Sequence, residues 1–236
     1  MRILALDTTT RGGSVALVDR DVLVAVEAGD ATRTHGERLP GDIMRLLRSR
    51  QMSLADIDVF AVAAGPGSFT GLRIGIATMQ GLAAANRKGL IGVSTLDALA
   101  HAAGRHMSAG GTDVYETVAV WMDAQRGEVF AALYGSADLS VLDGPLVARP
   151  EEVLTRWTSQ MSHAWFVGDG AVAYKPLLGQ HAVLEPTPLI APAIGWLAAE
   201  RARTGPVPGP DEIRPLYVRR PDAELARDRH KVRADR

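Results

Sequence analysis

One order of hydrophobic and turn segments occurs twice in this 236-residue chain, and this repetition constrains the fold more than any other feature. In the first half, a strand predicted near residues 3–7 ends in Asp7 and a polar turn. Two short strands follow, then a helix, a strand, a helix, a strand and a helix. The second half starts again with a strand over 118–122 that ends in Asp123, and the same order follows. The run 57–63 lacks polar alternation, which is typical of a parallel sheet covered on both faces. The sequence therefore predicts an α/β protein with two βββαβαβα halves.

The two halves resemble each other most closely at their first hairpins. Asp7 is followed by Arg-Gly-Gly-Ser-Val at 11–15, and Asp123 by Arg-Gly-Glu-Val at 126–129. Two such halves, packed together, form a cleft floored by the hairpins. This is the architecture of the duplicated RNase H-like fold found in the actin-like ATPase, sugar kinase and Hsp70 superfamily. We expect a first subdomain over 1–108, which also dimerises, a second over 109–220, and a charged tail over 221–236.

Composition and charge exclude several classes of protein. The chain has no cysteine, so it has no disulfide, thiolate zinc site or thiol nucleophile. Asp7 interrupts the first apolar run too early for a signal peptide, and no stretch approaches the roughly 18 apolar residues of a membrane span. We therefore expect a cytoplasmic protein. Residues 214–236 carry eight basic and four acidic side chains. Because the net charge of the whole chain is −1, the remaining residues carry a net charge of −5. Such an acidic body argues against a large phosphate-binding surface, and the tail is either a solvated end or an RNA contact.

The segment Gly-Pro-Gly-Ser-Phe-Thr-Gly at 65–71 suggests either a phosphate site or a structural turn. It lacks the lysine with which a Walker loop meets the β- and γ-phosphates. Free amides at the start of the next helix still leave anion binding open. We favour the turn, with glycines that adopt positive φ and with Ser68 or Thr70 as the helix cap.

A weak nucleotide site is a separate prediction, with Asp7, Gly12 and Gly168 as its candidate residues. In actin-like ATPases the first hairpin binds phosphate through a glycine close after the aspartate, whereas here three threonines follow Asp7. Gly168 lies after a strand of the second half, where such folds hold adenosine. We expect at most weak or vestigial ATP or ADP binding, and no required cofactor.

The sequence predicts neither a metal centre nor a catalytic residue. His101 and His106 are five residues apart, about 140° round a helix, and so cannot share a metal from one face. No Gly-x-Ser-x-Gly nucleophile motif is present.

The helix predicted over 71–86 is apolar nearly all round, with only Arg73 and Gln80 as a polar strip. A helix of this kind is buried on both sides. One side can cover its own sheet, and the other predicts contact with a second chain or burial beneath the second half. The neighbouring helix over 36–50 extends this surface. The predicted partner interface comprises Leu39, Ile43, Met44 and Leu47 of the first helix and Gly71, Gly75, Thr78, Met79 and Leu82 of the second.

Several motifs resemble those of the TsaB (YeaZ) family. They are ILALDTT at 3–9, HGERL at 35–39, GPGSFTGLRIG at 65–75, MDAQRGEV at 122–129, GDGA at 168–171 and PLYVR at 215–219. The likeness covers about residues 1–220, and the run at 65–75 is its most specific part. Gly36 stands where the family pattern usually has serine, and the charged extension after Pro221 is a second departure.

The resemblance implies a noncatalytic partner in making N6-threonylcarbamoyladenosine in tRNA. In that system TsaD carries a metal-binding histidine pair and transfers the threonylcarbamoyl group from its adenylate to an adenosine beside the anticodon. TsaE is a third member with ATPase activity, and tRNA is contacted through the complex. The resemblance further implies a dimerisation scaffold or activator that pairs with TsaD as a heterodimer and with itself as a homodimer. Two alternatives remain: a small-molecule ATP-dependent phosphotransferase that uses the Asp7–Asp123 cleft, and the metal-dependent glycoprotease of an older label.

Overall fold

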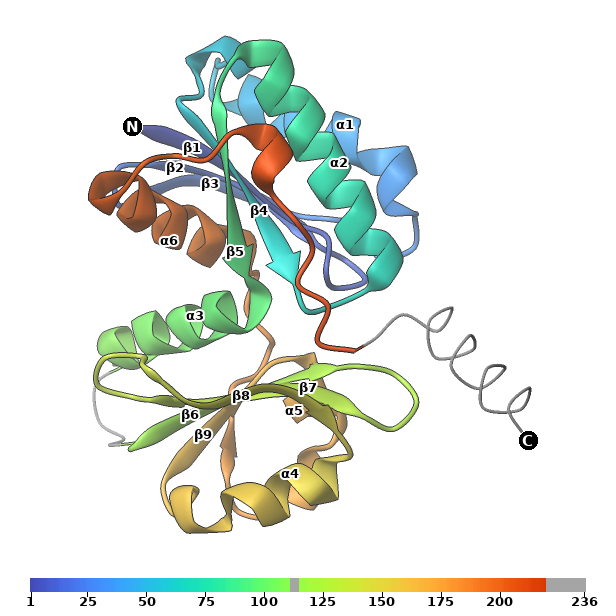
Figure 1. The fold of residues 1–236 in the computed structure, drawn as a ribbon, viewed down its shortest axis with the longest axis vertical. Coiled ribbons are helices and arrows are strands. Elements are labelled where there is room, and N and C mark those ends of the chain that lie inside the picture. Colours follow the sequence, from blue (N-terminus) through green and yellow to red (C-terminus); the bar gives the residue numbers. More distant parts are fainter. Residues whose placement is uncertain (111–114, 220–236) are drawn as a thin grey trace, which may run out of the picture.

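Two five-stranded sheets with corresponding strand orders form the framework of the protein (Figure 1). The computed structural model describes residues 1–110 and 115–219. The first sheet has the order β3-β2-β1-β4-β5 and the second β8-β7-β6-β9-β10. In each, the first strand of the half pairs antiparallel with the second and parallel with the fourth. The predicted duplicated RNase H-like fold is therefore confirmed. The strands are β1 (Arg2–Asp7), β2 (Ser14–Asp19), β3 (Val22–Ala28), β4 (Val59–Gly65), β5 (Gly89–Ser94), β6 (Thr117–Asp123), β7 (Val129–Gly135), β8 (Val141–Ala148), β9 (Ala164–Val167) and β10 (Ala182–Val183).

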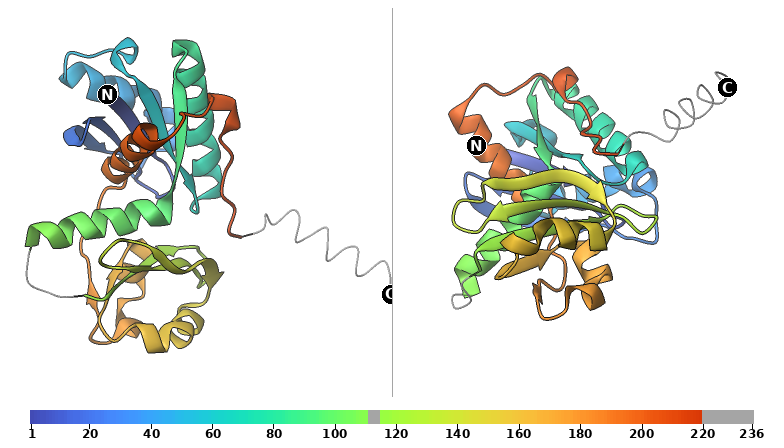
Figure 2. Two further views of the ribbon diagram at one scale, coloured as in Figure 1. Left: turned by 60° about the vertical axis from the view of Figure 1, so that its left-hand side comes forward. Right: turned by 60° about the horizontal axis from the view of Figure 1, so that its bottom comes forward.

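The helices pack in layers on both faces of the two sheets (Figures 1 and 2). The α-helices are α1 (His35–Ser49), α2 (Phe69–Asn86), α3 (Thr95–Gly110), α4 (Pro150–Trp157), α5 (Asp169–Ala173) and α6 (Ala191–Thr204). The 3₁₀ turns are η1 (Leu54–Asp56), η2 (Thr158–Gln160), η3 (Lys175–Leu178) and η4 (Pro210–Glu212). Helices α1 and α2 cover the outer face of the first sheet, and α4 and α5 cover the outer face of the second. Helices α3 and α6 lie between the sheets.

Side chains alternate between these layers along each central strand, as strand geometry requires. In β1, Leu4 and Leu6 point to the α1–α2 layer, whereas Ile3 and Ala5 point to the central layer. In β6, Trp121 faces the outer layer and Val120 the central one. Both faces are thus buried, which explains the continuous apolar runs in the sequence.

The two halves exchange their last helices across the central layer. α3 follows the first sheet in sequence but packs on β6 of the second, while α6 packs on β1 and β2 of the first. Gly195 permits this approach, because a Cβ there would lie 2.6 Å from Cγ2 of Val18. The expected boundary at 108/109 falls within the last turn of α3. Residues of both halves thus pack together in the apolar layer between the two sheets.

After α6, residues 205–219 form a segment that we call the C-terminal strap. In both views it runs beside β5 and α2 and reaches the second half (Figures 1 and 2). Among residues 1–110 and 115–219, none of the helices combines the length and the apolar character that crossing a bilayer demands.

Candidate functional site

Asp7 ends β1 at the junction of the two halves, and its carboxylate is fully occupied by its own hairpin. Oδ1 accepts hydrogen bonds from the Thr9 amide at 2.7 Å and the Thr9 hydroxyl at 2.5 Å, and Oδ2 accepts one from the Thr10 hydroxyl at 3.0 Å. The side chain is 1% exposed, and this burial raises the pKa of Asp7 against the opposing effect of those hydrogen bonds. The Thr10 hydroxyl also accepts from the amide of Gly13, which closes the turn. Thr9 and Thr10 thus occupy both carboxylate oxygens.

A buried arginine holds the same hairpin from the side of α1. Nη1 of Arg38 donates to Asp42 at 2.7 Å, and Nη2 contacts the Gly12 carbonyl. Nη2 also donates to Nδ1 of His35 at 2.8 Å, so Nε2 carries the imidazole proton and donates to the Thr10 carbonyl at 3.1 Å. Burial and then the Arg38 charge lower the pKa of His35. The Gly12 carbonyl, on a candidate nucleotide residue, is therefore bound within the chain.

The second half places two more carboxylates near this point. Asp169, at the start of α5, accepts hydrogen bonds from the amides of Asp123 at 3.0 Å and Gly170 at 2.9 Å. Burial raises the pKa of Asp169, and the negative charges of Asp123 and Asp7 raise it further. Asp123 itself accepts from the Gln125 amide at 2.8 Å and its side chain at 2.7 Å. The predicted meeting of the two aspartate hairpins is present, with each aspartate bonded to its own turn.

The glycines at these turns serve close packing. Gly168 has φ +114°, and a Cβ there would overlap the Trp121 carbonyl.

Within 1–110 and 115–219, no group of three or more His, Asp or Glu side chains could hold a metal ion. The ring of His101 packs at a tilt against Trp196 and that of His106 against Trp165, so the two rings have different neighbours.

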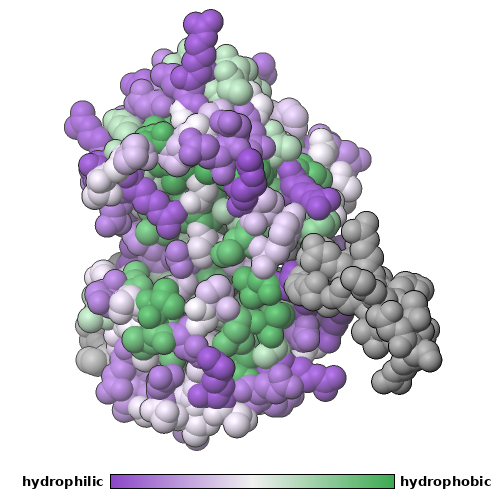
Figure 3. All heavy atoms as spheres, viewed as in Figure 1, coloured by the Kyte–Doolittle hydropathy of each residue, from purple (hydrophilic) through white to green (hydrophobic). Residues whose placement is uncertain are grey.

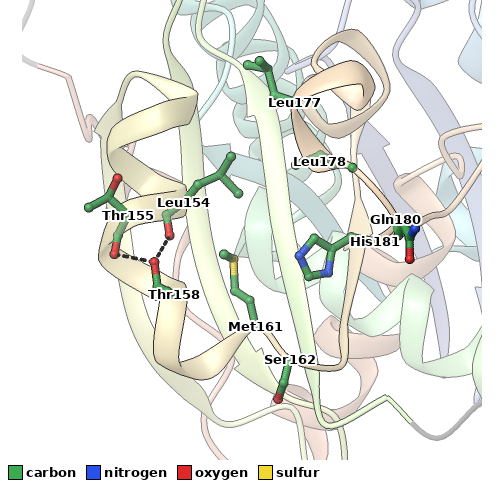
Figure 4. A pocket seen from close by; sticks show the side chains of 10 residues that line it. Leu154, Thr155, Thr158, Met161, Ser162, Leu177, Leu178, Gln180 and His181 are labelled. Carbon is green, nitrogen blue, oxygen red and sulfur yellow. Dashed lines mark hydrogen bonds between the residues drawn. The ribbon is translucent and has the colours of Figure 1, made fainter.

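A hollow of about 630 Å³ lies on the outer side of the second half, between α4 and the segment from η3 to β10 (Figure 4). Leu154, Met161 and Leu177 supply apolar surface, and His181 is its titratable side chain. The Thr158 hydroxyl already donates to the carbonyls of its own helix. No pair of acid and base groups lines this hollow.

The segment 65–71 forms the structural turn that the sequence favours. Gly65 and Gly67 have φ of +114° and +155°, and the Ser68 hydroxyl accepts a hydrogen bond from the Gly71 amide at 3.2 Å. The Ser68 amide donates to the Thr9 carbonyl at 3.0 Å. These two amides are thus bonded within the chain, and Ser68 rather than Thr70 caps α2.

The structure corrects the predicted partner surface on α1 and α2. Four of its residues are buried in the chain's own core. These four are Leu39, Ile43, Leu47 and Met79. Gly71 and Gly75 face Thr8 at the end of β1, so their small size serves the contact of α2 with its own sheet. Met44, Thr78 and Leu82 remain partly exposed.

The outward face of α2 consists of other small residues. Ala77, Gly81, Ala84 and Ala85 are exposed, and Ile74 flanks them. On α1, Gly36 and Gly41 are exposed beside Met44. A Cβ at Gly36, Gly41 or Gly81 would meet no atom of the described residues within 4 Å. We call these exposed residues of α1 and α2 the α1–α2 face. Helical periodicity groups the residues of α2 into arcs, but it does not show which arc packs on the sheet and which arc is exposed.

A second apolar surface lies on the other half, over β7 and β8 (Figure 3). Val141 and Leu142 of the edge strand β8 are exposed there. Pro145 interrupts this strand and has no amide to donate, which disfavours pairing with a further strand.

The chain is similar to known proteins over nearly its whole length. Residues 27–183 match the family model described as TsaD, tRNA N6-adenosine threonylcarbamoyltransferase. The chain is 36% identical over 228 residues to the tRNA threonylcarbamoyladenosine biosynthesis protein TsaB of Escherichia coli K12, which covers 93% of this chain and 95% of that protein. It is 34% identical over 134 residues to TsaB of Bacillus subtilis, 57% of this chain and 55% of that protein. The structure of YeaZ from Pseudomonas aeruginosa superposes with a TM-score of 0.75 at 29% identity, and covers 92% of this chain and 99% of that one.

Proposed function

Because the chain belongs to the TsaB family, we propose that it is a noncatalytic partner of a TsaD-type transferase in forming N6-threonylcarbamoyladenosine in tRNA. In this role it acts in the cytoplasm as a dimerisation scaffold or activator. The transferase supplies the chemistry that moves threonylcarbamoyl from its adenylate, and a TsaE-type ATPase is the third member. tRNA is contacted through the assembled complex, and the chain pairs with itself when alone.

The α1–α2 face is the observation that carries this proposal. Gly41 and Gly81 lie inside helices, where glycine costs about 1 kcal/mol relative to alanine. Within 1–110 and 115–219, no atom approaches either residue closely enough to require the missing side chain. Small residues allow a second helix to approach, so docking of a helical partner accounts for both positions.

The hairpins support a noncatalytic role. A phosphotransferase of this fold would need the first-hairpin aspartate to face a metal or phosphate. Here Asp7 is buried, and both of its oxygens accept hydrogen bonds from Thr9 and Thr10. The alternative function therefore requires the hairpin to be rebuilt on substrate binding. Brisk ATP turnover by the isolated chain, abolished in Asp7→Ala, would establish that alternative. Metal analysis of the purified protein tests the protease reading.

The main test is reconstitution with the cognate TsaD-type and TsaE-type chains, tRNA, threonylcarbamoyl-adenylate and ATP. Modified adenosine is measured by mass spectrometry, with each protein omitted in turn. We expect the modification to require both this chain and the TsaD-type chain. Full modification without this chain would refute the proposal.

A matched pair of variants links that activity to the face. Gly81→Arg places a long charged side chain on α2 where the monomer has open space, so the fold should be unaffected. It should weaken association with the TsaD-type chain and lower the modification. Arg149→Ala alters an exposed residue that precedes α4 on the other half, and should change neither.

A further inference from the structure

The C-terminal strap is held firmly along the first half. The Leu90 amide of the edge strand β5 donates to the Pro208 carbonyl at 3.1 Å, and the Gln80 side chain of α2 donates to the Pro210 carbonyl at 2.8 Å. Farther along, the Leu216 amide donates to the Ala64 carbonyl at 2.6 Å. These contacts give the strap a fixed path beside α2 up to the turn at 65–71.

At the start of α2 the strap completes an exposed aromatic cluster. The rings of Phe69 and Tyr217 lie 5.3 Å apart, and the Arg73 guanidinium lies 4.0 Å from the centre of the Phe69 ring. Nε of Arg73 also donates to the Tyr217 hydroxyl at 3.3 Å. Phe69 and Leu216 are each 41% exposed and Tyr217 is 38% exposed. We call these four residues the aromatic corner.

The aromatic corner is continuous with the α1–α2 face. Phe69, Arg73, Ala77 and Gly81 follow one another at intervals of four residues, so each neighbours the next in a row that slants round α2 by about 120° from Phe69 to Gly81. Large aromatic side chains and arginine are the residue types that dominate binding energy at protein interfaces. The row of small side chains on α2 thus leads to the large side chains of the aromatic corner at the N-terminal end of the helix.

We infer that the aromatic corner is part of the docking surface for the TsaD-type partner, which places an apolar side chain against Phe69, Leu216 and Tyr217 and a carboxylate against Arg73. This inference rests on the proposed function. The C-terminal strap then acts as a structural element of the interface, and partner binding depends on residues far from α1 and α2 in the sequence.

Charge favours the TsaD-type chain over a second copy at this corner. Arg73 makes no ion pair within 1–110 and 115–219, so its charge is available to a partner. α2 contains no Asp or Glu, and Arg87 and Lys88 follow its C-terminal end. Two copies packed antiparallel through α2 would bring Arg73 towards Arg87 and Lys88, and a parallel pair would bring it towards Arg73 of the other copy. The α2 helix of a second copy therefore offers no carboxylate to Arg73, whereas a different chain can.

Arg219 fixes the end of the strap. Its guanidinium donates to the Ala124 carbonyl at 2.6 Å and pairs with Glu128 on the β6–β7 hairpin. Arg219 thus holds Leu216 and Tyr217 in place without belonging to the corner. Its removal should weaken partner binding indirectly, by loosening the strap.

The test measures affinity for the cognate TsaD-type chain by calorimetry and self-association by sedimentation, for the same full-length variants. Tyr217→Ala and Leu216→Asp should each weaken the heterodimer about 30-fold, as expected for an interface anchor. Arg73→Glu should weaken the heterodimer but leave self-association unchanged or tighter, because it removes the repulsion between copies. Arg214→Ala, whose side chain contacts only the nearby carbonyls of Asp211 and Ile213, is the control.

Hydrogen exchange over residues 205–219 separates direct from indirect effects. Leu216→Asp and Arg73→Glu should leave protection of the strap intact, whereas Arg219→Ala should reduce it. Unchanged heterodimer affinity in Tyr217→Ala, Leu216→Asp and Arg73→Glu would overturn the inference, and so would an equal loss of homodimer and heterodimer. If Gly81→Arg weakens the heterodimer while the corner variants do not, the proposed function stands and the corner alone is refuted. If Gly81→Arg also has no effect, the α1–α2 face itself is refuted.

Discussion

Two glycines of α2 allow a matched test of how the packing of this helix divides between the chain and its partner. Gly75 and Gly81 both lie in the helix interior, where replacement by alanine favours the helix by about 1 kcal/mol. A Cβ on Gly75 would overlap the Thr8 hydroxyl and lie 3.2 Å from the Thr8 Cβ. Thr8 is fully buried and donates to the Gly71 carbonyl at 2.8 Å, so it cannot move without breaking that hydrogen bond. A Cβ on Gly81 meets nothing within 4 Å.

The expected free energies follow from these surroundings. Overfilling a packed site costs about 1–3 kcal/mol, and loss of the Thr8 hydrogen bond adds about 1 kcal/mol. After the gain in helix propensity, Gly75→Ala should lower the free energy of unfolding by about 1–3 kcal/mol. Gly81→Ala should raise it by about 1 kcal/mol, which corresponds to about 2–4 °C in Tm for a chain of this size.

Urea unfolding of the two variants and the wild type measures both values, with equal m-values as the check that only stability has changed. Association with the TsaD-type chain is measured on the same samples, and the more stable Gly81→Ala should bind more weakly. If Gly75→Ala proved as stable as Gly81→Ala, the contact between α2 and the end of β1 would not be rigid, and our assignment of the two faces of α2 would be wrong.

Three further predictions concern the hairpin at the junction of the halves and the His35 side chain of α1 that contacts it. Asp7→Asn keeps an acceptor for Thr9, so its free energy of unfolding at pH 7 should stay within about 1 kcal/mol of the wild-type value, and it should support tRNA modification. Loss of modification with an intact fold would show that the carboxylate has a chemical role. Because the pKa of Asp7 is raised by burial, the wild type should also lose stability as pH rises from about 4 through the folded pKa, and Asp7→Asn should lack this contribution in urea titrations. The pKa of His35 is lowered, so the folded chain binds fewer protons than the unfolded chain just below pH 6.5, and stability should fall as pH drops through that window. His35→Gln should flatten this slope and leave the part due to His101, whose pKa is also lowered by burial; an unchanged slope would contradict the neutral imidazole bonded to Arg38 and Thr10.

The sequence could predict what short-range patterns determine. The strand ending in Asp7, its polar turn and the helix after it are local features, and α1 begins and ends within one residue of its expected range at 36–50. The repetition of the pattern after Asp123 then defines a duplicated fold, since each half must build its own sheet. Positive φ at glycines of 65–71 and a hydroxyl cap for α2 also follow from residue type and position, although the sequence left Ser68 and Thr70 as alternatives for the cap.

Contacts between distant segments could not be predicted in the same way. Gly71 and Gly75 suggested a surface for another helix, but the chain's own Thr8 occupies that space. Arg38 looks like a solvated helix residue, yet it is buried between α1 and the first hairpin, where Asp42, His35 and Gly12 bind its two terminal nitrogens and Nε has no partner among the described residues. The exchange of α3 and α6 depends on how two sheets face each other, which no local pattern encodes.

The hydrogen-bonded hairpin at Asp7 and the exposed α1–α2 face depend on the same contacts. The turn after Asp7 contacts the start of α2 directly. The Thr9 carbonyl accepts a hydrogen bond from the Ser68 amide, and Thr8 packs on Gly71 and Gly75. Thr9, which binds the Asp7 carboxylate, and its neighbour Thr8 therefore also help to position α2. A change that opened the hairpin for a nucleotide would shift the helix that carries Ala77 and Gly81. Thr8 and Thr9 hold α2 in place while Thr9 also binds the Asp7 carboxylate, so opening the hairpin would disturb the position of α2.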